Sequence, residues 1–264
     1  MRVGIIGTGQ IGGMLAIAFA RMKQPHITII NRTRSKAINI QLEYPEQIQI
    51  AKSMEQMIMT SDFLFLCLKS KDSRDWLAKW GELLSVNHCV VVTASQIPLA
   101  EAESMTVAQL VKVIPSITQS ALAGYLLYAL GERTDEMTTA NLLYLLSQIG
   151  LPLCITENKA RIYADLNSCG PAFTATLIRL MAEEAEKKGV PLHAAELMII
   201  EMLMGTIQLL KDRQFTLQQI IQKVSVPGGV TEAGVDILQE TLPSVFHALF
   251  EATEGRHQEI RSTF

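Results

Sequence analysis

The first 22 residues constrain the fold of this chain most, because they place a glycine turn between a strand pattern and a helix pattern. Residues 2–6 form a short apolar run, residues 7–12 read Gly-Thr-Gly-Gln-Ile-Gly, and an apolar helical pattern follows. G-x-G-x-x-G in this context is typical of dinucleotide binding. Gly7 permits the turn, Gly9 lets a pyrophosphate approach and Gly12 lets the helix pack on the strand. The N–H groups at the helix start then face the anion.

The composition indicates a globular protein of one large domain or two ordinary ones. The chain has 264 residues, of which 48% are hydrophobic and 19% charged. Its net charge of −3 gives no reason to expect a nucleic acid or an anionic membrane as a partner. The uncharged windows at residues 113–131 and 138–156 contain polar residues, Pro and Gly, so neither is typical of a membrane-spanning helix.

The cysteines predict neither disulfides nor a metal site. They are scattered, without a C-x-x-C pair or histidines at ligand spacing: Cys67, Cys89, Cys154 and Cys169. This usage is typical of reduced thiols, so we expect a cytoplasmic protein without a bound metal.

The end of the second predicted strand bears on the choice of cofactor. Residues 26–30 form that strand, and Asn31, Arg32, Thr33 and Arg34 follow it. In NAD-binding folds an acidic residue here binds the ribose 2′-OH, and this chain has none. Two arginines flanking a hydroxyl suit a 2′-phosphate, so we favour NADP over NAD. A solvated turn with Thr33 or Ser35 as a helix cap is the alternative, and both can hold together.

Strand and helix patterns alternate up to about residue 156. Further strands are predicted at residues 48–51, 63–68, 89–93, 112–114, 125–130 and 153–155, and helices at 53–59, 74–85 and 135–149. Such a series predicts an α/β fold with a Rossmann-type, doubly wound, mostly parallel sheet. Beyond residue 158 we find only helical periodicity, at residues 171–188, 192–211, 216–223, 230–239 and 242–261. We therefore predict a dinucleotide-binding domain at 1–157 and an all-helical domain at 158–264.

The helix predicted at residues 192–211 is apolar on almost every face. Such a helix must be buried all round. A helical domain of about 105 residues can hardly surround it alone, so we predict a homodimer built through this domain. A central helix covered by its own neighbours is the alternative.

Small polar segments follow the predicted strands and precede the predicted helices. Lys69 follows a strand directly, and Thr93, Ala94 and Ser95 could pass close to a nicotinamide ring. In the helical half, Val-Pro-Gly-Gly-Val-Thr at residues 226–231 opens a helix, where free N–H groups can bind a carboxylate. The alternatives are that Lys69 is an ordinary surface lysine and that residues 226–231 form a simple turn between helices. The five histidines are isolated, and we expect surface or structural roles for them.

Five ordered segments make the chain resemble the Δ1-pyrroline-5-carboxylate reductase family over essentially its whole length. They are G-T-G-Q-I-G, N-R-T, I-P-S for the family's M-P-N, S-C-G-P-A for G-S-G-P-A, and V-P-G-G-V-T for S-P-G-G-T-T. The substituted forms resemble the ComER-like branch, found with bacterial competence operons. The resemblance implies a Rossmann domain followed by a helical domain that interlocks with a partner subunit.

The resemblance also implies roles for individual residues. The pyrophosphate site would comprise Gly7, Thr8, Gly9, Gln10, Ile11 and Gly12. The other predicted cofactor contacts are Asn31, Arg32, Thr33, Lys69, Ser70 and Ala94. The substrate carboxylate would lie at Val226, Gly228, Gly229, Val230 and Thr231, with Thr231 as the candidate proton donor to the ring nitrogen.

Three departures from the family pattern bear on activity. Val226 replaces a substrate-binding serine, Ser70 a proline and Ser116 an asparagine. We expect cofactor binding to survive them and substrate binding to be weakened. The first hypothesis is an NADPH-dependent reductase of a small cyclic imine, with pyrroline-5-carboxylate as the expected substrate. The others are an NADP-binding regulatory protein that has lost activity, and a reductase of a different imine or keto compound.

Overall fold

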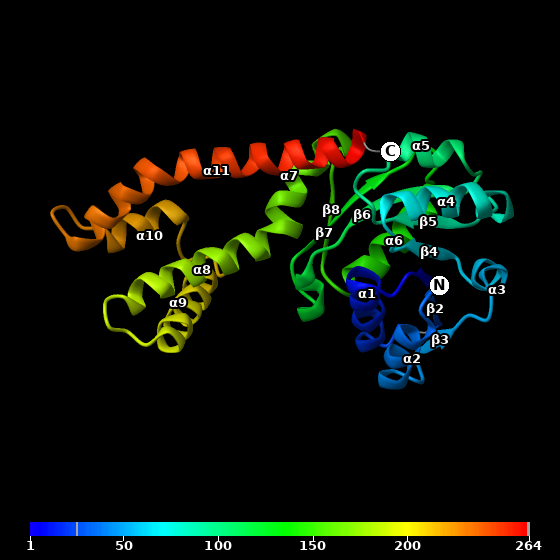
Figure 1. Ribbon diagram of the computed structural model, residues 1–264, viewed down its shortest axis with the longest axis horizontal. Helices are drawn as coiled ribbons and strands as arrows, with labels where there is room; N and C mark the ends of the chain where they lie inside the picture. Colours follow the sequence, from blue (N-terminus) through cyan, green and yellow to red (C-terminus); the bar gives the residue numbers. More distant parts are fainter. Residues whose placement is uncertain (25, 263–264) are drawn as a thin grey trace. The chain divides into compact units, whose positions relative to one another are not determined.

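The computed structural model describes residues 1–24 and 26–262 (Figure 1). The chain divides into two compact units: Met1–Cys169 with the C-terminal segment from Arg256, and Gly170–Gly255. Each unit is described by itself below. The domain boundary predicted between residues 157 and 158 stays a prediction.

The first unit is built on one eight-stranded sheet in the order β3-β2-β1-β4-β5-β6-β7-β8. All neighbouring strands are parallel except β6 and β7, which are antiparallel. The order reverses direction beside β1, as in the doubly wound Rossmann fold. The predicted fold class is therefore confirmed. The strands are β1 (Val3–Ile6), β2 (Ile27–Ile30), β3 (Ile48–Ile50), β4 (Phe63–Leu66), β5 (Cys89–Val92), β6 (Gln109–Ile114), β7 (Tyr125–Leu130) and β8 (Leu151–Cys154).

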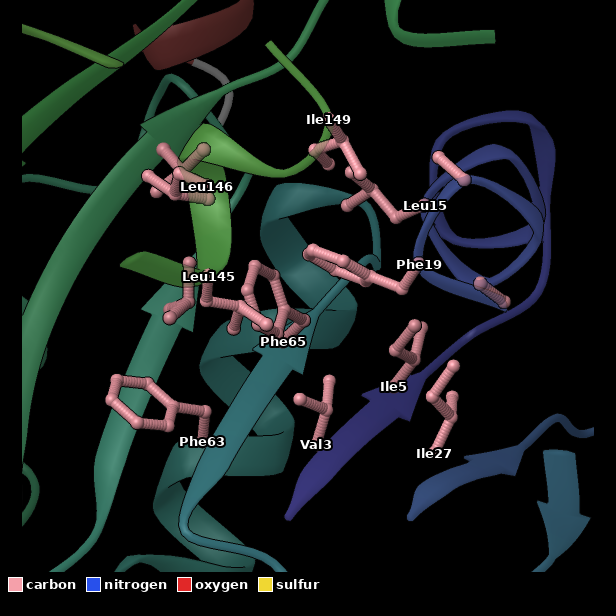
Figure 2. Packing of buried hydrophobic residues seen from close by; sticks show 14 of the residues in the cluster. Val3, Ile5, Leu15, Phe19, Ile27, Phe63, Phe65, Leu145, Leu146 and Ile149 are labelled. Atoms are coloured by element: carbon pink, nitrogen blue, oxygen red, sulfur yellow. The ribbon is translucent and has the colours of Figure 1, made fainter. Parts of the chain in front are cut away.

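The central strands are buried on both faces, which explains their continuous apolar runs. Successive side chains enter opposite core layers: Phe65 lies in the first layer, and its neighbours Leu64 and Leu66 lie in the second. In the first layer Phe19 packs edge-to-face on Phe65, with ring centroids 5.7 Å apart (Figure 2). The helices of that layer are α1 (Gln10–Arg21), α2 (Arg34–Glu43) and α6 (Glu136–Ser147). Those of the second layer are α3 (Met54–Met59), α4 (Ser70–Trp80), α5 (Leu99–Ser104) and α7 (Ala160–Ala164).

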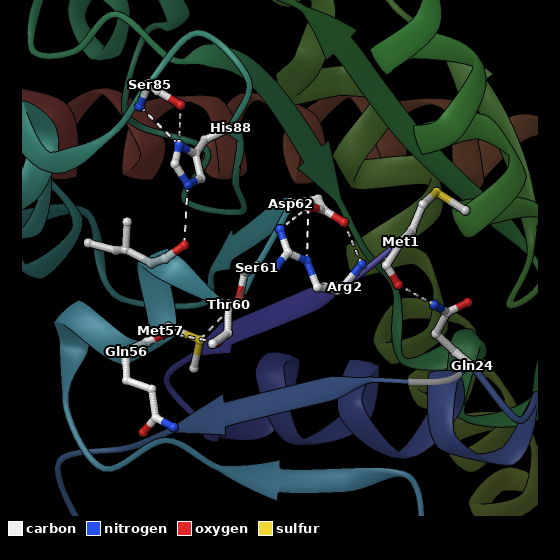
Figure 3. Close-up of polar contacts among 11 residues, drawn as sticks. Met1, Arg2, Gln24, Gln56, Met57, Thr60, Ser61, Asp62, Ser85 and His88 are labelled. Carbon is white, nitrogen blue, oxygen red and sulfur yellow. Dashed lines mark hydrogen bonds and ion pairs between the residues drawn. The ribbon is translucent and has the colours of Figure 1, made fainter.

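Polar contacts tie the amino-terminal ends of β1 and β4 together (Figure 3). The backbone N–H of Arg2 donates to Asp62 Oδ2 at 2.8 Å, and the Arg2 guanidinium donates to Asp62 Oδ1 at 2.6 Å. Burial alone would raise the pKa of the Asp62 carboxyl, but these hydrogen bonds outweigh it and hold the pKa below its ordinary value. This ion pair lies at the edge of the sheet opposite to the carboxyl ends of the strands.

The second unit is helical. Its elements are α8 (Gly170–Glu186), α9 (Leu192–Lys211), α10 (Leu217–Val224) and the first part of α11 (Val230–Ser262). The sequence predicted two helices, at 230–239 and 242–261, where the structure has one 33-residue helix with Pro243 inside it. A proline removes one backbone hydrogen bond, and here the turns on either side continue the helix through it. The sequence also missed α5, a helix of six residues.

Helix α9 exposes much of its apolar surface in the single chain. Its half-exposed side chains are Leu197, Met198, Ile200, Met202, Met204 and Ile207. The alternative of a central helix covered by its own neighbours within this unit is therefore wrong. Among residues 1–24 and 26–262, α9 is also the one helix long and apolar enough to cross a membrane by length and composition, which is weak evidence for a span.

Candidate functional site

The loops that follow β1, β2, β4 and β5 meet at the carboxyl edge of the sheet. The strand order reverses between β1 and β4, and ligands of doubly wound folds bind in the crevice at such a point. Two adjoining pockets lie along this edge, and Leu68 lines both of them. They form the candidate cofactor groove, with one end beside β2 and the other beside β5.

The glycine turn has different spatial requirements at its three glycines. Gly7 has a φ of +90°, a region that L residues rarely adopt. A Cβ on Gly12 would lie 1.8 Å from the carbonyl oxygen of Gly7, so only glycine allows α1 to start this close to β1. A Cβ on Gly9 would have no heavy atom within 4 Å. Gly9 therefore opens on free space beside the groove that it lines.

The start of α1 suits an anion. Gly9 occupies the N-cap position and has no side chain to cap the helix. The first turn contains no acidic residue. The N–H groups of this turn and the positive end of the helix dipole favour a phosphate. Within the described residues, the buried hydroxyl of Thr8 has no hydrogen-bond partner. An open glycine cradle and an unpaired hydroxyl both fit a pyrophosphate.

Asn31 joins the glycine turn to the turn after β2. Its Oδ1 accepts from the backbone N–H of Thr8 at 3.0 Å, and its Nδ2 donates to the carbonyl oxygen of Thr33 at 2.9 Å. Both ends of the carboxamide are thus used within the protein. The predicted contact between Asn31 and the cofactor stays a prediction, and the structure adds a bracing role that the sequence did not indicate.

The β2 end of the groove carries two cationic side chains and one hydroxyl. Arg32, Thr33 and Lys36 line it together with Asp72 and Asp75 of α4. Arg34, which the sequence grouped with Arg32, lines neither pocket. Sequence analysis missed Lys36. Its place in the first turn of α2, three residues after Thr33, is the signal that could have found it, because positions three apart on a helix share a face.

The β5 end of the groove is lined by two loops that contact each other. One contains Lys69 and Ser70 after β4, and the other contains Thr93, Ala94, Ser95 and Gln96 after β5. The Ser70 hydroxyl donates to Gln96 Oε1 at 2.5 Å, a bond that a proline in its place could not make. Lys69 is exposed at the rim. Cys67 also lines this end of the groove, and desolvation raises the pKa of its thiol to about 12, which favours the protonated form.

The predicted substrate residues lie in the second unit, at the turn before α11. Gly228 has a φ of +75°, and Thr231 lies in the first turn of the helix. Val226 is 56% exposed. The backbone N–H of Gly228 donates to Glu232 Oε2 at 2.7 Å. A carboxylate of the chain itself therefore uses an N–H group that the sequence assigned to the substrate carboxylate.

No arrangement for metal chemistry appears in residues 1–24 and 26–262. No three His, Cys, Asp or Glu side chains among them lie close enough to hold a metal ion.

Sequence and structure comparisons place the chain in a family. Residues 157–260 match the family described as pyrroline-5-carboxylate reductase dimerisation, and residues 2–96 match NADP oxidoreductase coenzyme F420-dependent. ComE operon protein 4 of Bacillus subtilis (strain 168) is 34% identical over 98% of this chain and 96% of its own. The chain belongs to the pyrroline-5-carboxylate reductase family.

A more distant relative in sequence and a solved structure similar in fold agree with this assignment. Pyrroline-5-carboxylate reductase 3 of Bacillus subtilis (strain 168) is 24% identical over 97% of this chain and 96% of its own. The solved structure of the pyrroline-5-carboxylate reductase from Coxiella burnetii matches with a TM-score of 0.88, at 20% identity, over 98% of this chain and 97% of that one. The resemblance of the five ordered segments to this family is therefore confirmed.

Two glycines of the turn give a paired test of the groove. Gly9→Ala should weaken dinucleotide binding by about tenfold or more and should change stability far less than Gly12→Ala, because its Cβ enters only the open cradle. Gly12→Ala should also lower the midpoint of thermal unfolding, because its Cβ would overlap the Gly7 carbonyl. Calorimetric titration with NADPH and thermal unfolding measure the two effects. Wild-type affinity in the Gly9→Ala protein would contradict the placement of the pyrophosphate.

Proposed function

We propose that this protein is an NADPH-dependent reductase of a small cyclic imine, with conversion of pyrroline-5-carboxylate to L-proline as the expected reaction. The observation that carries the proposal is the groove at the carboxyl edge, with a glycine cradle in its middle and Arg32, Thr33 and Lys36 at one end. Membership of the reductase family supports the reaction class.

The residues of the turn after β2 and of the first turn of α2 favour NADP over NAD. Arg32 and Lys36 offer charge to a 2′-phosphate, and the Thr33 hydroxyl offers a hydrogen bond. The turn after β2 carries no carboxylate to hold a free ribose 2′-OH. The cofactor supplies the hydride when bound, and the protein has to position and polarise the imine. This accounts for the lack of a strong base among the predicted site residues.

We assign substrate binding to the turn before α11. In this proposal the turn at Gly228, Gly229 and Val230 binds the substrate carboxylate through the backbone N–H of Val230, and the Thr231 hydroxyl donates a proton to the ring nitrogen. The N–H of Gly229 donates to the carbonyl oxygen of Val226 at 2.9 Å and so belongs to the turn itself. A small-molecule substrate and a cytoplasmic location belong to the same proposal, and the four unbridged cysteines are consistent with a reducing compartment.

A second candidate is a reductase-like regulatory protein that binds NADP without turnover. Two observations favour it: Val226 offers no hydrogen bond, and the Glu232 carboxylate already engages the N–H of Gly228. Both weaken the hold on a second carboxylate. The relative at 34% identity is named ComE operon protein 4, and this name states no reductase activity. A reductase of a different imine or keto compound is the third candidate.

A turnover assay separates these candidates. Purified protein with NADPH and pyrroline-5-carboxylate should form proline. Val226→Ser should raise kcat/KM by about tenfold to a hundredfold, because it restores one hydrogen bond to a charged ligand. Thr231→Val should lower kcat. Tight binding of NADPH without proline formation or proline affinity would favour the regulatory protein, and turnover only within a panel of other imines and keto acids would favour the third candidate.

A matched pair of arginine variants tests the choice of cofactor. Arg32→Ala should weaken NADPH binding by about tenfold or more and leave NADH binding unchanged, because it removes a charge-assisted contact to the 2′-phosphate. Arg34→Ala removes the same charge outside the pockets and should change neither affinity by more than about twofold. Fluorescence titration with both cofactors measures this. Equal losses for NADPH and NADH in Arg32→Ala would contradict the assignment.

We also propose that the protein is a homodimer formed through α9, supported by the dimerisation family match and the exposed apolar side chains of that helix. Light scattering at micromolar concentration should give the dimer mass. Met198→Lys should yield monomers, because it places a charge on this surface. The control Met59→Lys changes a residue on α3 that is 76% exposed and should remain dimeric. A monomeric wild type would contradict the proposal.

A further inference from the structure

Lys112 is a buried lysine inside the sheet. Its strand, β6, lies between β5 and β7, and Lys112 is paired with Val92 on one side and Ala129 on the other. Both of these neighbours belong to the second core layer. The lysine is only 2% exposed. Burial of a charge among apolar side chains is unfavourable unless the charge is paired and hydrogen-bonded.

The partners of Lys112 lie at the loop that lines the β5 end of the groove. Its Nζ donates to Glu157 Oε1 at 2.5 Å and to the carbonyl oxygen of Ser95 at 3.3 Å. The same carboxylate accepts from the backbone N–H of Leu99, at 3.0 Å for Oε1 and 3.3 Å for Oε2. The ion pair therefore ties the groove loop at Ser95 and again at Leu99, where α5 begins.

The opposite side of this loop is held from α4. The guanidinium of Arg74 donates to the carbonyl oxygen of Gln96 at 3.3 Å, and Ser70 donates to the side chain of the same residue. Before the loop, the Thr93 hydroxyl donates to the carbonyl oxygen of Leu66 at 2.9 Å. The α4 contacts hold Gln96, whereas Lys112 on β6 holds Ser95. Removal of the lysine takes away the hydrogen bond to the Ser95 carbonyl oxygen and the cation that pairs with Glu157.

We propose that Lys112, through its ion pair with Glu157, is a positioning residue that holds the loop at residues 93–96 against the nicotinamide half of the cofactor. The inference rests on the proposed function, because it needs a dinucleotide that runs from Arg32 to this loop. Lys112 itself does not line the groove. Its effect therefore falls on one half of the cofactor only, which distinguishes positioning from a general structural role.

Two ligands separate the two halves of the cofactor. NADPH occupies the whole groove, whereas 2′,5′-ADP occupies only its β2 end. Lys112→Met should raise the dissociation constant of NADPH by about tenfold or more and leave that of 2′,5′-ADP within about twofold. It should also reduce the enhancement of nicotinamide fluorescence on binding. Lys112→Arg retains a cation that can pair with Glu157 and should restore most of the NADPH affinity.

A control variant and a second variant of the pair complete the test. Asp62→Asn breaks the Arg2–Asp62 ion pair at the opposite edge of the sheet (Figure 3) and should change neither affinity. Glu157→Gln disrupts the same buried pair while retaining an oxygen for the N–H of Leu99. If Lys112→Met does not fold, Glu157→Gln tests the same proposal. It should weaken the binding of NADPH and leave the binding of 2′,5′-ADP unchanged.

The outcomes differ for the positioning role and for the proposed function. Wild-type NADPH affinity in a folded Lys112→Met or Glu157→Gln protein overturns the positioning role, and so does an equal loss for both ligands. A wild-type protein that binds 2′,5′-ADP as tightly as NADPH overturns it as well, while the β2 end keeps its assignment. A wild-type protein that binds neither ligand overturns the proposed function and, with it, the positioning role.

Discussion

The contact between Gly12 and the carbonyl of Gly7 is the constraint on which the rest of the first unit depends. Because Gly12 has no Cβ, α1 begins directly at the end of β1. This position brings Leu15 and Phe19 into the first core layer, where Phe19 packs on Phe65. It also directs the free N–H groups of the helix start toward the groove. One steric requirement therefore serves both the core and the anion site.

Polar side chains hold the loops of the carboxyl edge in fixed relation to one another. Asn31 bridges the glycine turn and the turn after β2, Ser70 bridges the loops after β4 and β5, and Lys112 supports the last of these from inside the sheet. Each of these hydrogen bonds joins two segments that are distant in the sequence. A groove built from separate loops needs such links, because a loop without them carries unsatisfied backbone groups and moves freely.

The helical half differs from the family pattern where a substrate carboxylate would bind. Val226 removes a hydroxyl, and Glu232 reaches back to the N–H of Gly228 as a capping residue does at a helix start. A capping carboxylate stabilises the helix, and it competes with any other anion for the same N–H group. The Glu232 carboxylate can thus stabilise the helix start and weaken a substrate site, which is why cofactor binding and turnover are separate questions for this chain.

The sequence alone determined the fold class, most strands and the glycine turn, because these depend on periodicity and on glycines at fixed spacing. The family followed from the resemblance of five ordered segments. It misjudged α11, since Pro243 reads locally as a helix end, and it missed α5, which has only six residues. It grouped Arg34 with Arg32, whereas the first turn of α2 brings Lys36 to the pocket instead. Only the tertiary structure revealed the side-chain partners of Asn31, Ser70 and Lys112. In the sequence, the partners of Lys112 lie 17 and 45 residues away, the partner of Ser70 lies 26 away, and a partner of Asn31 lies 23 away. No local sequence pattern predicts contacts between segments this far apart.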